Sequence, residues 1–174
     1  MRAYESADAE AVLAINLECV PEVGDMDAEK LDFFSKNASF FVVAEAKDFS
    51  TSERSELGDL DETVIGFLIG LDEAVVGYGS NNYAWFKERF PNFAYVDRVA
   101  VTADAQSKGL GPAMYRAFEA WAIGFGKTYL TAEVNTIPDN PHSHHFHTKF
   151  GFEESGTGNP YGNEQEVRYY SKTL

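Results

Sequence analysis

The stretch of sequence that decides the fold reads Asp97-Arg98-Val99-Ala100-Val101-Thr102-Ala103-Asp104-Ala105-Gln106-Ser107-Lys108-Gly109-Leu110-Gly111-Pro112. Near Val99 and Val101 apolar residues alternate between two faces, which predicts a β-strand. A turn with two glycines follows. We then expect a helix over about residues 112–124, with Pro112 at its first position. This succession of strand, turn and helix is typical of α/β proteins.

The turn before this helix has the chemistry of a phosphate-binding site. Gly109 and Gly111 allow the backbone to approach a ligand closely and to adopt a positive φ angle. The amides at a helix N-terminus lack internal partners and lie at the positive end of the helix dipole, so they attract phosphate. Lys108 adds a cation beside them. A turn with two glycines also occurs as a plain strand-to-helix connection, so the turn alone leaves both interpretations open.

On both sides of this segment the hydrophobic pattern predicts further helices and strands. Helices are expected over residues 8–19, 28–36, 83–90, 112–124 and 142–150, and strands over residues 39–47, 63–71, 94–101, 128–135, 152–155 and 166–171. Residues 48–62 are polar and acidic, which predicts a loop or hairpin connection. The alternation of strands and helices in the second half favours one domain, residues 1–174, with an α/β fold and a mixed sheet.

Composition limits the class of protein. The chain has 174 residues, of which 44% are hydrophobic, and a net charge of −14, which is typical of a globular domain. Its one cysteine, Cys19, permits no internal disulfide and fits a reducing, cytoplasmic location. No segment reads as a secretory signal or a membrane span. The acidic balance disfavours nucleic acid as a partner. The excess of acidic residues suits a cationic substrate, and a role in keeping the protein soluble explains it equally well.

Two motifs resemble those of the GNAT superfamily of N-acetyltransferases. Gln106, Gly109 and Gly111 fit the pattern Gln/Arg-x-x-Gly-x-Gly/Ala of the family's coenzyme A pyrophosphate loop. The register differs from the dinucleotide fingerprint, which requires Gly-x-Gly-x-x-Gly. No Gly-Lys-Ser/Thr follows the glycines, so the turn is also unlike a Walker loop.

The second motif lies in residues 140–152 and resembles the family signature Asn-x-x-Ala-x-x-Leu/Phe-Tyr-x-x-x-Gly-Phe. The matching positions are Asn140, Phe146, Gly151 and Phe152. Two positions depart from the signature, because Ser143 replaces the small alanine and His147 stands where the family usually has tyrosine. The two motifs cover residues 94–155 well, and the resemblance is weakest over residues 1–93.

The resemblance implies a GNAT-like α/β (α+β) fold, with a mixed six- or seven-stranded sheet flanked by about four helices. It also implies direct transfer of an acetyl group from acetyl-coenzyme A (acetyl-CoA) to a primary amine of a small molecule or a peptide N-terminus. No metal is implied. The backbone of Val99, Ala100 and Val101 would meet the thioester oxygen. The other residues expected to bind the cofactor are Gln106, Ser107, Lys108, Gly109, Leu110, Gly111, Pro112, Asn140, Ser143 and His147.

The motifs determine the catalytic groups less closely than they determine the cofactor-binding residues. At the tyrosine position, His147 has three open roles: general acid for the leaving thiolate, ligand contact, or packing residue. Candidates for the base that deprotonates the amine are Asp97 and Tyr95, on the strand before the turn. Glu133 on the facing strand and Glu45 on an earlier strand are further candidates, and Asp97 is equally suited to pair with Arg98.

Other interpretations remain open at this point. The four histidines, His142, His144, His145 and His147, are spaced for metal ligands on a helix, but no cysteine or His-Glu-x-x-His motif accompanies them. An alternative to catalysis is a GNAT-like module that only binds acyl-CoA, as a sensor or interaction domain. Phe33, Phe34, Tyr83, Trp85 and Phe86 are candidates for an acceptor pocket. A homodimer is also possible, with the strand over residues 166–171 as an edge.

Overall fold

A computed structural model describes residues 1–47, 62–106, 108–162 and 165–174. The expected loop over residues 48–62 therefore lies almost wholly outside the described residues. The elements are β1 (Arg2–Ala3), α1 (Ala9–Glu18), α2 (Ala28–Asn37), β2 (Phe40–Lys47), β3 (Glu62–Asp72), α3 (Asn81–Arg89), β4 (Phe93–Val101), α4 (Leu110–Gly124), β5 (Tyr129–Ile137), α5 (Pro141–Phe150), β6 (Glu153–Gly158) and β7 (Glu166–Thr173). Short 3₁₀ turns cover Ser6–Asp8 and Ala103–Ala105.

The described strands form one mixed sheet of seven in the order β1-β2-β3-β4-β5-β7-β6. Every neighbouring pair is antiparallel except β4 and β5, which are parallel. This confirms the predicted mixed sheet. Five α-helices flank it in the described part of the chain, where about four were expected.

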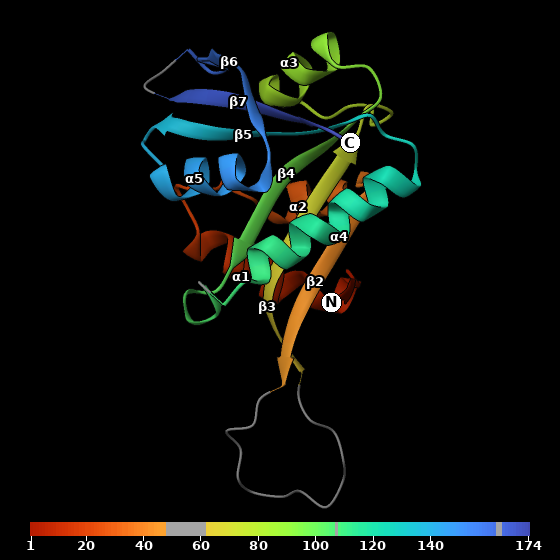
Figure 1. Cartoon of the computed structure of the whole chain (residues 1–174). Helices are drawn as coiled ribbons and strands as arrows, with labels where there is room; N and C mark the ends of the chain where they lie inside the picture. The colour runs from red at the N-terminus through yellow and green to blue at the C-terminus, as the bar shows by residue number, and fades with distance from the viewer. Residues whose placement is uncertain (48–61, 107, 163–164) are drawn as a thin grey trace, which may run out of the picture.

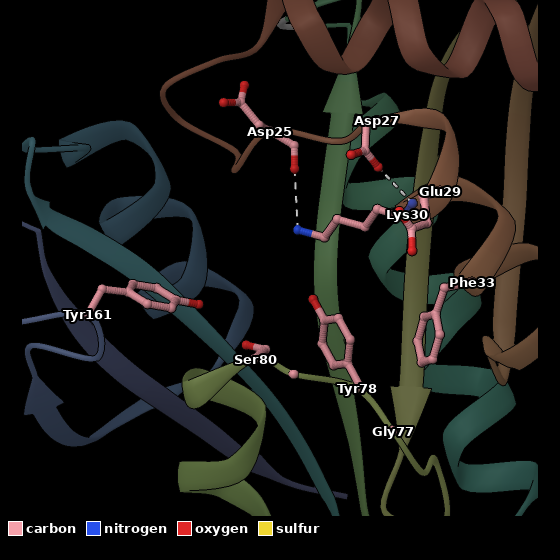
Figure 2. Close-up of a pocket in the computed structure, with 10 residues that line it drawn as sticks. Asp25, Asp27, Glu29, Lys30, Phe33, Gly77, Tyr78, Ser80 and Tyr161 are labelled. Carbon is pink, nitrogen blue, oxygen red and sulfur yellow. Dashed lines mark hydrogen bonds between the residues drawn. The ribbon is translucent and has the colours of Figure 1, made fainter.

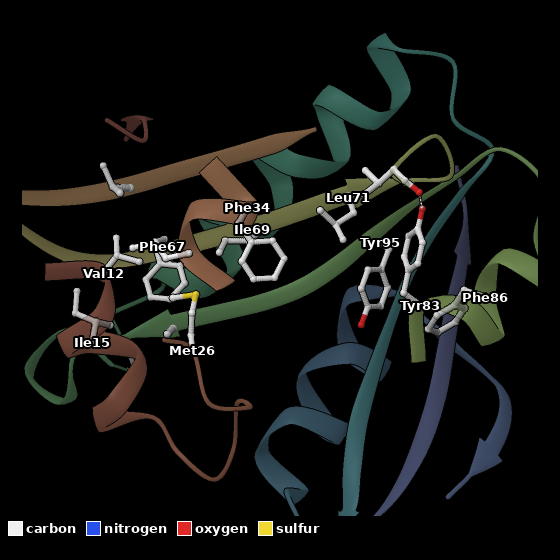
Figure 3. Close-up of a cluster of buried hydrophobic side chains, with 14 of the residues drawn as sticks. Val12, Ile15, Met26, Phe34, Phe67, Ile69, Leu71, Tyr83, Phe86 and Tyr95 are labelled. Atoms are coloured by element: carbon white, nitrogen blue, oxygen red, sulfur yellow. Dashed lines mark hydrogen bonds between the residues drawn. The ribbon is translucent and has the colours of Figure 1, made fainter. Parts of the chain in front are cut away.

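The helices cover the two faces of the sheet, as Figure 1 shows. On one face α1, α2 and α3 contribute Val12, Ile15, Phe34 and Phe86 to a core that includes Phe67 of β3 (Figure 3). On the other face α4 packs Met114, Tyr115, Phe118 and Ala122 against the sheet. Phe125, which follows α4, is 69% exposed and does not contribute to this core.

Helix α4 begins earlier than its proline indicated. Gly109 adopts the left-handed conformation with φ of 82° and caps the helix, which begins at Leu110. Pro112 is consequently the third helical residue, not the first. The position still suits proline, because the first-turn amide that it lacks has no intrahelical partner.

The C-terminal strand is not an edge of the sheet. β7 pairs with β5 on one side and with β6 on the other, so β6 is the outer strand at this end. The expectation that residues 166–171 offer an edge for dimerisation is therefore wrong. The cause is that β7 returns between β5 and β6, an order that local sequence patterns do not encode.

Gly70 of β3 lies directly beneath Phe118 of α4. A Cβ atom at Gly70 would overlap the fully buried Phe118 ring. We expect Gly70→Ala to lower the free energy of unfolding by about 1–3 kcal/mol, because the ring must shift in a closely packed core. Urea denaturation tests this, with Gly124→Ala as control, since a Cβ at Gly124 meets no atom within 4 Å. Equal stability of both variants would contradict the packing.

Candidate active site

The sheet is split between β4 and β5. The two strands pair only at Phe93–Tyr129, Ala94–Leu130 and Tyr95–Thr131. Beyond Tyr95, β4 continues with β3 as its partner and β5 continues with β7, so the two strands diverge in Figure 1. The unpaired side of β4 therefore presents backbone N–H and C=O groups that a ligand can bind.

A β-bulge lies on β4 just beyond the point where the strands part. Val96 pairs with Gly70 and Arg98 pairs with Ile69, so Asp97 has no partner residue on β3. Bulges of this kind redirect side chains and backbone groups, and they are common beside active sites. The expected backbone contact at Val99, Ala100 and Val101 lies farther along the same strand.

The glycine turn lies at the far end of β4. Gly109 and Gly111 face open space, since a Cβ atom at either would meet no atom within 4 Å. Beside them is a hollow of about 270 Å³, which is lined by Ile65, Ala105, Lys108, Gly109, Leu110 and Ala113. The first-turn amides of α4 and Lys108 make this hollow suitable for an anion.

Gln106 and Ser107 are the first two residues predicted for this turn. The Gln106 side chain donates a hydrogen bond from Nε2 to the Val101 carbonyl oxygen at 3.3 Å, so it shapes the turn. Ser107 lies outside the described residues. Their contacts with a cofactor remain predictions.

Near the point where the strands part, Glu133 of β5 is held with one carboxyl oxygen free. Its Oε1 accepts hydrogen bonds from Tyr95 Oη at 2.9 Å and from Asn82 Nδ2 at 3.0 Å. Its Oε2 is buried and has no partner among the described residues. Burial, and secondly the charge of Asp97, raise the pKa of Glu133 to about 8. This carboxyl group can therefore take or hold a proton near neutral pH.

Asp97 is engaged by its neighbours. One oxygen accepts from Tyr78 Oη and the other from Arg98 Nε, the latter at 2.8 Å. Arg98 also donates to Asn16 Oδ1 and to the Gly24 carbonyl oxygen, both at 2.9 Å. Both oxygens of Asp97 are thus occupied, so the geometry favours its pairing role over a role as base.

Glu45 is not brought to this group. Its Oε1 accepts from Arg2 Nε at 2.7 Å, at the β1–β2 end of the sheet. Of the four candidate bases, Tyr95 and Glu133 therefore lie together. Asp97 is in an ion pair, and Glu45 lies at another part of the sheet.

His147 is buried between α5 and the sheet, with only 3% of its surface exposed. Nδ1 lies 2.8 Å from the Ser143 carbonyl oxygen, which can only accept, so Nδ1 carries the proton. Nε2 then accepts from Tyr115 Oη at 2.8 Å. Burial lowers the pKa of His147 to about 4. A neutral ring with both nitrogens engaged favours the packing role over that of a general acid.

His147→Phe is expected to reduce stability rather than turnover. The buried Tyr115 hydroxyl would lose its acceptor, which costs about 1–3 kcal/mol of unfolding free energy, while kcat should stay within about threefold. Denaturation and initial rates measure the two effects. His145→Phe is the matched control, because His145 is exposed on the same helix. A large loss of kcat at unchanged stability would restore the acid role.

Asn140 and Ser143 form the N-terminus of α5. Asn140 Oδ1 accepts a hydrogen bond from the Ser143 amide at 3.0 Å, and Pro141 occupies the first turn. An asparagine cap followed by proline is a common start of a helix. Contacts of both side chains with a cofactor remain predictions.

His144, one of the four clustered histidines, is held by two hydrogen bonds. His144 is hydrogen-bonded through Nδ1 to Tyr170 Oη at 2.9 Å and through Nε2 to the Asn135 carbonyl oxygen at 3.0 Å. Within the described residues, no group of three or more His, Cys, Asp or Glu side chains is placed to hold a metal ion.

A second hollow, of about 490 Å³, opens on the side of β4 away from α4 (Figure 2). Its lining includes Phe33 and Tyr78, and the Tyr78 hydroxyl donates to Asp97. Of the aromatic residues expected in an acceptor pocket, only Phe33 lines this hollow. Phe34, Tyr83 and Phe86 are buried in the core, and Trp85 stacks on Tyr169 with ring centroids 3.9 Å apart. They are core residues because α2 and α3 each turn an apolar face to the sheet.

Sequence reasoning did not single out three residues of this region. Asn82 and Tyr78 lie in the segment between β3 and β4, where no motif applied, and Lys30 lies on α2. The one available signal was Asn82, a polar residue on the buried side of an otherwise aromatic helix, only 7% exposed.

A model of the acetyltransferase (GNAT) family matches residues 31–152, which include the split, the glycine turn and α5. The chain therefore belongs to the acetyltransferase (GNAT) family. This confirms the resemblance noted in its two motifs and the expected class of enzyme, an acetyltransferase. Comparison with curated protein sequences gives no significant match.

Solved structures share the fold over the whole chain. Ard1 from Thermoplasma volcanium superimposes with a TM-score of 0.72 at 18% identity, covering 99% of this chain and 95% of that chain. A ribosomal-protein-alanine N-acetyltransferase from Brucella melitensis gives 0.68 at 20% identity, with 99% and 98% covered. Naa20 of Chaetomium thermophilum, in complex with a bisubstrate analogue, gives 0.70 at 18% identity, with 99% and 85% covered. These similarities confirm the GNAT-like fold. Among the residues described, no helix is both long enough and apolar enough to cross a membrane.

Proposed function

We propose that this acetyltransferase uses acetyl-CoA and acetylates a primary amine of a small molecule or a peptide. The observation that carries the proposal is the split between β4 and β5. It has an anion-binding glycine turn at one end and, where the strands part, the free carboxyl oxygen of Glu133.

The residues present suit the cofactor. The first-turn amides of α4, the open space beside Gly109 and Gly111, and the cation of Lys108 would hold the pyrophosphate. Unpaired backbone groups of β4 beyond Tyr95 would hold the pantetheine arm by strand-like hydrogen bonds. Bound acetyl-CoA would supply an acetyl group activated as a thioester.

Glu133 is the proposed base. Tyr95 and Asn82 hold its Oε1, which leaves Oε2 to take the proton that the amine loses as it becomes an amide. A base works best when its pKa lies near the working pH, and the pKa of Glu133 is raised to about 8. The thiol of the leaving group has a pKa of about 8.5, so its release places little demand on a general acid. A buried, neutral His147 that does not act as a general acid is compatible with this mechanism.

Calorimetric titration of the purified protein tests the proposal. Acetyl-CoA and desulfo-coenzyme A should both bind in the micromolar range, and NADH should not. Thiol release with an amine library should then show turnover. Binding without turnover on any amine would favour the acyl-CoA sensor over the enzyme. Absence of binding would leave an interaction domain as the remaining interpretation.

The pH profile should report Glu133. Because the base must be ionised, kcat/KM should rise with pH and level off above an apparent pKa of about 8. The acceptor should be an amine that stays neutral throughout, such as 2,2,2-trifluoroethylamine, so that only the enzyme titrates. In Glu133→Gln the residual rate should be independent of pH over the same range. An unchanged profile in that variant would assign the titration to another group.

A further inference from the structure

Lys30 of α2 is a half-buried cation without an ionic partner. Its ammonium donates to the main-chain oxygen of Asp25 at 3.3 Å, and within the described ranges no carboxylate lies close enough to pair with it. Other lysines are paired, such as Lys127 with Asp72 and Lys172 with Glu119, at 3.0 and 2.5 Å. Burial, and secondly the charge of Arg98, lower the pKa of Lys30, and the charges of Asp97, Asp27 and Asp25 offset this only in part. An anion beside it would offset that burial.

Lys30 lines the second hollow, on the side of β4 away from α4. Figure 2 shows its ammonium and the hydroxyl groups of Tyr78 and Tyr161 directed toward the interior of the hollow. The Tyr78 hydroxyl is already donated to Asp97. The hollow therefore offers two groups that can bind an anion, the ammonium of the half-buried Lys30 and the phenol of the exposed Tyr161.

Three carboxylates, those of Asp25, Asp27 and Glu29, lie at the rim of the same hollow. All three residues are exposed, so water and salt screen their charges. Asp27 is also engaged, because its Oδ1 accepts from the Lys30 amide at 2.8 Å. In Figure 2 the carboxylate of Asp25 points away from Lys30. The rim of the hollow is thus acidic, whereas the charge of the half-buried Lys30 is positive.

The hollow borders the proposed reaction centre. Tyr78 separates the two, since its ring lines the hollow and its hydroxyl reaches Asp97 at the bulge of β4. Asp97 is in turn near enough to Glu133 to raise the pKa of that carboxyl. The hollow and the proposed reaction centre therefore share the wall that Tyr78 and Asp97 form.

We propose that Lys30 binds a carboxylate of the acceptor, with the Tyr161 hydroxyl as a second donor. The acceptor is then an amine that also carries a carboxylate, a small molecule of the amino-acid class. This inference rests on the proposed acetyl transfer and narrows its acceptor. The acidic rim suits the ammonium that such a zwitterion carries before it reacts.

The test compares the twenty L-amino acids with their carboxamides as acceptors, using acetyl-CoA and thiol release. The free acids should have the higher kcat/KM, by at least about tenfold for the best pair. Lys30→Met should remove this preference by lowering kcat/KM for the acids alone, and Lys30→Arg should keep most of it. Lys36→Met is the matched control. Lys36 lies on the same helix, 67% exposed and paired with Asp32, and its loss should leave the preference unchanged.

A binding measurement separates this inference from the proposed function. Protein saturated with coenzyme A is titrated with the N-acetyl derivatives of the L-amino acids and with the matching carboxamides, so the choice of ligand does not depend on turnover. Tighter binding of the carboxylate that depends on Lys30 supports the subsite even if no amine is turned over. Turnover that favours carboxamides, or a Lys30→Met variant that weakens acids and carboxamides equally, would overturn the subsite and leave acetyl transfer standing.

Discussion

Glu133→Gln is expected to lower kcat by about 10²- to 10⁴-fold while leaving the affinity for acetyl-CoA unchanged. Glutamine keeps the shape of the side chain and can still accept from Tyr95 and Asn82 at the oxygen that those residues contact. It cannot take a proton at the second position. Initial rates with a validated amine, together with calorimetric titration of acetyl-CoA, measure the two effects. Glu153→Gln is the control, because Glu153 is exposed on β6.

The same variant should change how stability depends on pH. The pKa of Glu133 rises from 4.5 to about 8 on folding. Between these values the folded protein holds a proton that the unfolded chain has lost, so the folded state becomes less stable as pH rises from 4.5 to 8. The loss is on the order of 5 kcal/mol at most. Glu133→Gln should thus unfold at higher denaturant concentration than the parent at pH 9, with little difference at pH 4.5. Identical curves at pH 9 would mean that the carboxyl is not desolvated.

The second large effect is expected at the glycine turn, where Gly111→Glu should weaken acetyl-CoA binding at least about 100-fold. The new side chain would occupy the open space beside the first-turn amides, and its charge would repel phosphate. A Cβ at Gly111 meets no atom within 4 Å, and its φ angle is not in the left-handed region. The loss of binding should therefore come without a loss of stability.

Two further glycines make this experiment decisive. Gly124→Glu places the same side chain at the other end of α4, where it also meets open space, and it should bind acetyl-CoA normally. Gly109→Glu should abolish binding and also destabilise the fold by about 1–2 kcal/mol, because Gly109 has a φ angle of 82°. Normal affinity of Gly111→Glu, measured by titration, would refute the assignment of the turn to the cofactor.

The predictable parts of this protein are those that neighbouring residues determine. The cap at Asn140, the glycine turn and the strand before it follow from local backbone chemistry, and the structure places the predicted elements in sequence order. The two motifs also lie within the matched part of the family model. A mixed sheet follows from the alternation of strands and helices.

The candidate site depends on contacts between distant segments, which one sequence does not reveal. Glu133 acquires its raised pKa from burial near Asp97, with Tyr95 and Asn82 as partners 38 and 51 residues away. His147 resembled a catalytic residue by position alone, and its partner Tyr115 lies 32 residues earlier in the chain. In both cases the chemistry is set by which elements the sheet order brings together.

The two hollows are built from different parts of the chain. The hollow beside the glycine turn is lined by Ile65, Ala105, Lys108, Gly109, Leu110 and Ala113. The hollow beside Lys30 is lined by Asp25, Asp27, Glu29, Lys30, Phe33, Gly77, Tyr78, Gly79, Ser80 and Tyr161. The two sets of residues do not overlap. Substitutions that reshape the hollow beside Lys30 are therefore expected to leave the hollow at the glycine turn unchanged. With the roles proposed above, the amine acceptor could be changed by substitutions that leave the residues proposed to hold the acetyl donor untouched.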